Sequence, residues 1–214
     1  SSVGLFQQLE HLRVNGSTAL NGGVVITKNY QKYMGPAMMG EDNTLISNGA
    51  GDIKFANTLD GQYTLEAQTA GTTKFLGTVG GQGDLDSVTT DAPGNVHIAA
   101  DMNAALLDYG DPADLGSSVT LKGTEAVIFN QTLDGEGHSA VVQSPYTLLV
   151  GNVCDMDLLN TDADGLTEIG ANVTGHKLDF DDVVVVLGNS IITGHDYVDF
   201  DQTLDAADFG GGLA

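Results

Sequence analysis

The sequence predicts an all-β protein folded as a single elongated parallel β-solenoid. Two observations carry this prediction: a long internal repeat and short runs of alternating polarity. The phrase Phe-x-x-Thr-Leu-Asp occurs at 55–60, 129–134 and 200–205. Repetition at such a long period is typical of a chain built by stacking one supersecondary unit on the next. A structural or binding role is therefore favoured over a single catalytic pocket.

Other positions keep the register of this phrase. An aromatic residue precedes each of the three phenylalanines by roughly twenty positions, at Tyr33, Tyr109 and Phe180. Glycine turns recur with nearly the same period as the phrase. The residues that we expect to define the repeat are Gly16, Phe55, Gly61, Gly94, Phe129, Gly135, Gly165 and Phe200.

These recurrences divide the chain into units within one repeat domain. Residues 1–51 form a partial unit, 52–125 and 126–196 form two full units, and 197–214 form a stub. In this scheme the three phenylalanines of the phrase stack at equivalent inward positions.

Within a unit the local period is two. Residues 53–55, 63–65 and 96–98 alternate apolar with polar side chains, as half-buried strands do. Clusters of Gly, Asn and Asp bound these runs and accept the positive φ of tight turns. Helical spacing is confined to 5–12, where a strand is favoured over a short helix, and to 102–107, which fits a turn or two of helix.

The repeat is too long for one coil of a solenoid. Apolar anchors at Phe55, Phe75, Ile98 and Val119 lie roughly twenty residues apart, so that each repeat unit holds three to four coils. Neighbouring coils pair at ~4.8 Å, and roughly ten coils would give a rod about 50 Å long. Blades of a β-propeller usually run ~40–50 residues, well short of this unit, which argues against that fold.

The chain is strongly acidic, with 29 acidic and seven basic residues and a net charge of −22. Such a surface repels nucleic acids and anionic membranes, and no stretch approaches the ~18 apolar residues of a membrane span. The composition suits a secreted or cell-surface protein, where counterions screen the self-repulsion. A single cysteine, Cys154, excludes an internal disulfide.

Candidate sites are few. Asp162 and Asp164 form the best candidate for a calcium site, because alternating carboxylates supply the oxygen ligands that Ca²⁺ prefers. No other cofactor is predicted. The five histidines are dispersed, and no nucleophile, P-loop or dinucleotide motif is present, so no catalytic residue is assigned. Only seven basic residues are available to bind an anionic sugar chain.

Apolar residues mark a predicted contact surface. Neither terminal stretch has the charged cap that protects an open strand edge, so we expect the ends to meet further repeats of a longer chain or another copy. The residues of this surface are Val3, Leu5, Phe6, Met34, Met38, Met39, Phe200 and Phe209.

Several segments carry a family resemblance. Residues 52–55, 70–81 and 87–94 and the Thr-Leu-Asp-Gly turn resemble the β-strand-repeat segments of very large bacterial surface proteins. Those proteins are similar to filamentous-haemagglutinin and autotransporter-type adhesins. The resemblance covers most of 50–206 and is clearest in 52–100.

The resemblance implies a right-handed parallel β-helix in the stalk of a secreted or cell-surface fibre, without cofactor or catalytic residues. The ligand would be a carbohydrate or another cell-surface molecule. This chain departs from the pattern by being short, acidic and irregular between units. Two alternatives therefore stay open: a subunit that assembles head-to-tail into an extracellular filament and, more distantly, a polysaccharide-active β-helix enzyme.

Overall fold

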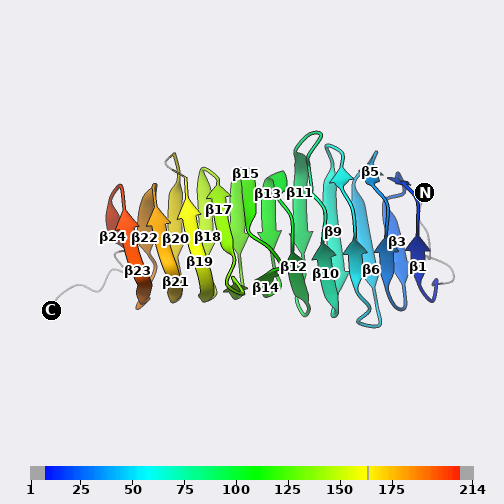
Figure 1. Ribbon diagram of the computed structural model, residues 1–214. Helices are drawn as coiled ribbons and strands as arrows, with labels where there is room; N and C mark the ends of the chain where they lie inside the picture. The colour runs from blue at the N-terminus through cyan, green and yellow to red at the C-terminus, as the bar shows by residue number, and fades with distance from the viewer. Residues whose placement is uncertain (1–7, 163, 208–214) are drawn as a thin grey trace.

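The computed structural model describes residues 8–162 and 164–207, which form one rod of stacked coils (Figure 1). The described residues contain no helix, and their parallel strands stack in a β-solenoid of about ten coils. The predicted all-β parallel β-helix is therefore confirmed. Residues 102–107, whose spacing fits a turn or two of helix, belong instead to strand β13.

Each coil has three faces, which we call A, B and C in chain order. Face A contains β1 (Leu12–Val14), β4 (Gln31–Tyr33), β7 (Ile53–Phe55), β10 (Thr72–Phe75), β12 (Asn95–Ile98), β14 (Ala113–Leu115), β16 (Leu133–Asp134) and the first residues of β19 (Val153–Thr161), β21 (Val173–Phe180) and β23 (Ile192–Phe200). The rest of β19, β21 and β23 lies on face B.

Faces B and C complete the coil. Face B also contains β2 (Thr18–Leu20), β5 (Ala37–Met39), β8 (Leu59–Asp60), β17 (Ser139–Gln143) and the first residues of β13 (Met102–Tyr109) and β15 (Val119–Phe129). Face C contains the rest of β13 and β15 with β3 (Val24–Thr27), β6 (Asn43–Ser47), β9 (Thr64–Thr69), β11 (Leu85–Thr90), β18 (Tyr146–Leu149), β20 (Leu166–Ile169), β22 (Val183–Val186) and β24 (Leu204–Ala206).

Alternating polarity places the core inside the coils. In β7, Ile53 and Phe55 are fully buried, whereas Lys54 between them points outward and is half-buried. Successive side chains of a strand point to opposite faces of the sheet, so every face presents one apolar row inward and one polar row outward. One cluster of buried apolar residues runs from Leu20 to Val184.

Aromatic rings stack between neighbouring coils. Tyr33 lies 5.0 Å from Phe55, Tyr109 lies 5.0 Å from Phe129, and Phe180 lies 5.2 Å from Phe200, measured between ring centroids. The sequence spacing of about twenty residues between these partners is therefore one coil.

The predicted equivalence of the three repeat phenylalanines is wrong. Phe55 ends a strand of face A, Phe129 ends one of face C, and Phe200 ends one of face B. The distance along the chain from one copy of the phrase to the next is three full coils plus two faces of the following coil. Successive copies therefore lie at different corners. The phrase thus encodes a corner: the phenylalanine closes one face, and the leucine four residues later opens the next.

The predicted role of the turn glycines also needs correction. Gly61 has the expected positive φ, 123°, but the φ angles of Gly94 and Gly165 lie outside the left-handed region. A Cβ on Gly165 would lie 2.5 Å from the carbonyl oxygen of Ser144 in the preceding coil, and one on Gly94 would collide with that of Thr69. At these corners glycine is required because stacked coils approach closely.

Candidate functional site

Many of the acidic side chains cap backbone amides at the corners. Asp162 Oδ1 accepts a hydrogen bond from the Ser144 amide at 2.8 Å, and Asp91 Oδ1 accepts one from the Thr69 amide at 3.0 Å. Donor and acceptor lie about one coil apart in each pair. Unpaired backbone groups at a corner would be costly, so this capping explains part of the acidic composition.

The calcium candidates lie at a corner between faces B and C. Asp162 is half-buried and engaged by Ser144, whereas Asp164 is exposed. Both border an open hollow of about 310 Å³, which Lys122 also lines. No group of three or more His, Cys, Asp or Glu suited to a metal ion occurs among the described residues. A calcium site at Asp162 and Asp164 stays a prediction.

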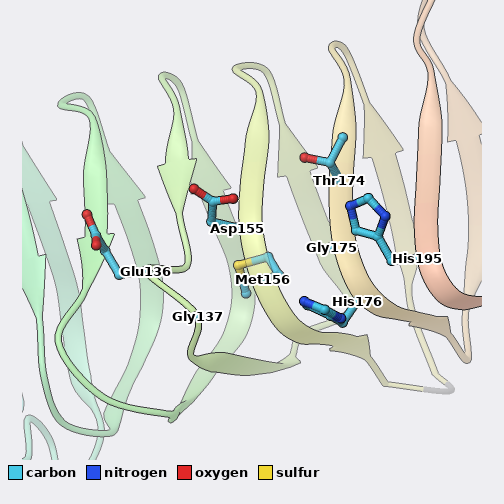
Figure 2. A pocket seen from close by; sticks show the side chains of 8 residues that line it. All are labelled: Glu136, Gly137, Asp155, Met156, Thr174, Gly175, His176 and His195. Atoms are coloured by element: carbon cyan, nitrogen blue, oxygen red, sulfur yellow. The ribbon is translucent and has the colours of Figure 1, made fainter.

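A pocket of about 260 Å³ opens where faces A and B meet in the last coils (Figure 2). The strands are irregular here, with register shifts between Val153 and Met156 and between Gly175 and Lys177. Its lining residues are Glu136, Gly137, Asp155, Met156, Thr174, Gly175, His176 and His195.

The pocket combines carboxylates with imidazoles on successive coils. The rings of His176 and His195 lie 5.6 Å apart, and His176 Nδ1 lies 3.8 Å from Asp196 Oδ2. Figure 2 shows Glu136 and Asp155 on the two preceding coils. Within the described residues, neither carboxylate is hydrogen-bonded to either imidazole. The pocket therefore holds acid–base groups without an assembled proton relay.

Two other acids are buried at corners. Asp182 accepts hydrogen bonds of 2.7 Å from the hydroxyls of Thr161 and Thr167. Burial raises the pKa of Asp182, although these two bonds lower it in part. Burial and, second, the charge of Asp91 raise the pKa of Asp111 to about 7. Neither carboxyl oxygen of Asp111 has a hydrogen bond of normal geometry among the described residues, and the nearby Thr90 hydroxyl offsets the rise in pKa only in part.

Four of the seven basic residues form one row on the outer side of face A. Arg13 pairs in register with Lys32, Lys32 with Lys54, and Lys54 with Lys74. We call these four residues the basic row. Sequence reasoning missed it, although the four positions follow one another at about the coil length.

The residues predicted to form a contact surface differ in how far they are exposed. Met39 is buried in the core and cannot contact a partner, which corrects that part of the prediction. Met34 is half-buried, Met38 is 46% exposed, and Phe200 is half-buried against Phe180. Val3, Leu5, Phe6 and Phe209 lie outside the described residues.

Comparisons with known proteins do not assign a function to any of these sites. No family model, curated protein or solved structure was found to match the chain. No helix in the described part of the chain is long and apolar enough to cross a membrane.

Proposed function

We propose that this chain is a rigid structural or adhesive segment of a secreted or cell-surface fibre. The observation that carries the proposal is the continuity of the solenoid. About ten coils share one core, without a break into separate domains, over the described residues. A rod of this kind holds its two ends apart and displays rows of outward side chains along its length.

The packing favours a load-bearing role. Parallel pairing links every coil to the next, and buried aromatic stacks add contacts along the axis. In repeat architectures each unit contacts only its neighbours, so stiffness depends on these interfaces. In this rod the interfaces between coils are formed by the capped corners and the apolar core.

A second candidate is a subunit that assembles head-to-tail. In the last described coil, apolar side chains of the core are exposed to solvent. Phe200, Ile192 and Val198 are only partly buried, and Leu204 is 49% exposed. At the other end, a hollow of about 280 Å³ is lined by Leu12, Val14 and Tyr33 among others. These exposed apolar side chains at both described ends support this second candidate, because burying them against another copy would be favourable.

Electron microscopy of the native protein tests the proposal. Thin isolated rods, labelled on intact cells by antibodies against this segment, are expected for a stalk. Regular helical polymers formed by the purified chain would favour head-to-tail assembly. Turnover of a polysaccharide, abolished by Glu136→Gln or Asp155→Asn in the pocket of Figure 2, would replace both candidates with an enzyme.

A further inference from the structure

We propose that the basic row binds an extended acidic polysaccharide, a chain of uronic acids, across the first four coils of face A. This inference deepens the proposed adhesive role, on which it rests. Its central observation is that residues dispersed in the sequence become a line of four cations in the folded chain.

The row is unfavourable for folding. Like charges directly opposite each other on neighbouring strands destabilise a sheet, and three such contacts follow one another here. Among the described residues the row forms one ion pair, from Lys74 Nζ to Asp52 Oδ2 at 2.7 Å. Arg13 donates a hydrogen bond to the neutral Asn15 side chain. An anion bound along the row would relieve this repulsion.

The geometry matches a linear polyanion. Rungs of a parallel ladder are spaced by about 4.8 Å, and one hexose unit of an extended polysaccharide advances by a comparable distance. Neighbouring carboxylates of such a chain point to different sides, so the long lysine and arginine side chains of the row would reach them from one side rather than meet them in strict register. The row ends at His97, the next rung after Lys74, because the His97 imidazole is paired with Asp114.

An aromatic wall beside the row favours a sugar chain over other anions. The rings of His11 and Tyr30 stack with centroids 4.9 Å apart, and Lys32 Nζ lies 4.1 Å from the Tyr30 ring centroid. These residues line an open hollow of about 360 Å³ that also includes Asn29 and Asp52. Pyranose rings pack their apolar C–H groups on aromatic side chains, whereas inorganic phosphate gains nothing from such a wall.

The charge distribution permits this binding despite the net charge of −22. Residues 1–80 hold six acidic and five basic residues, whereas residues 81–214 hold 23 and two. The screening length is about 8 Å at physiological ionic strength, so the row is largely shielded from the acidic coils further along the rod.

The test uses the intact chain and a defined oligogalacturonate, with a neutral glucan of the same length as the control ligand. Binding to the oligogalacturonate is expected to weaken with salt, with a slope of about −3 in log K against log salt for four contacts. The double variant Lys32→Gln/Lys54→Gln should bind about tenfold more weakly and roughly halve the slope. Tyr30→Ala should weaken binding without changing the slope.

The matched control is Lys122→Gln/Lys177→Gln, which removes the same charge outside the row and should change binding by less than about twofold. No binding at low salt, or equal losses in both double variants, would overturn the proposal. Equal affinity for single-stranded DNA would make the row a general polyanion site. Self-association lost in Lys32→Gln/Lys54→Gln would assign the row to a second copy, and either result rejects the sugar ligand. Rods in micrographs are independent of all these outcomes, so failure here leaves the proposed function standing.

Discussion

The ring of Phe55 lies parallel to the ring of Phe75 in the next coil, with centroids 5.7 Å apart and planes 1° from parallel. Tyr33 stacks on the other side of Phe55, so that three aromatic residues of face A form a continuous column. All three are buried, and each belongs to a different coil. This column joins the first coils into one body.

Removing the central ring should weaken that body. Phe55→Ala is expected to reduce the free energy of unfolding by about 3–5 kcal/mol, because it deletes a buried ring and leaves a cavity between two others. Urea denaturation followed by circular dichroism measures the loss. Phe200→Ala serves as the comparison: Phe200 is only partly buried, so its loss should be smaller. Equal losses would contradict the prediction that the fully buried central ring contributes more than a partly buried one.

Because stacked coils approach closely, replacing the corner glycine Gly151 by a larger residue should destabilise the fold. A Cβ on Gly151 would collide with the backbone of Gln131, whereas one on Gly16 would meet nothing within 4 Å. Gly151→Ala should therefore destabilise the fold by about 1–3 kcal/mol, as other overpacked sites do, and Gly16→Ala should be nearly neutral. The two melting temperatures, measured side by side, decide the matter. A neutral Gly151→Ala would show that the corner relaxes freely.

The buried Asp111 should make stability depend on pH. Its pKa of about 7 in the folded protein exceeds the unfolded value of 3.8, so the folded state holds a proton that the unfolded state releases. Stability is then greatest below the unfolded pKa and falls as pH rises towards 7, by at most ~1.4 kcal/mol per pH unit.

Asp111→Asn should remove this part of the pH dependence. The variant's advantage over the original chain is expected to grow from about pH 4 and to level off above about pH 7. Unfolding free energies at a series of pH values measure it. Asp86→Asn, at an exposed position of β11, provides the control. Parallel curves for Asp111→Asn and the original chain would contradict the assignment.

The backbone conformation at the pocket of Figure 2 predicts that a glycine substitution there stabilises the fold. Glu136 has a φ of 48° and Asp155 one of 50°, in the left-handed region that L-residues other than Asn and Asp avoid. Glu136→Gly should stabilise the fold by about 0.5–1 kcal/mol, and Asp155→Gly by less. Glu125→Gly, in the extended strand β15, should destabilise it. Thermal unfolding of the three variants would refute the argument if Glu136→Gly were the least stable.

The fold class could be predicted because its signals are local. Alternating runs such as 53–55 specify half-buried strands, and turn residues separate them. The spacing in sequence between the aromatic residues Tyr33 and Phe55 equals the length of one coil. The positions of the repeats could not be predicted, since a corner between any two faces demands the same residues. Coil length also varies: the coil from Val96 to Ala113 is shorter than the one from Thr73 to Val96, which shifts the register unpredictably.

The sequence by itself determined the strands, the core-facing positions and the acidic surface of this protein, because these follow from polarity and from the chemistry of single residues. Only the tertiary structure decided which outward residues are neighbours. Arg13, Lys32, Lys54 and Lys74 are far apart along the chain, and each coil between them has a different length. In-register hydrogen bonding of parallel strands converts those unequal lengths into a common spacing of about 4.8 Å. That register, which no single segment encodes, assembles the basic row.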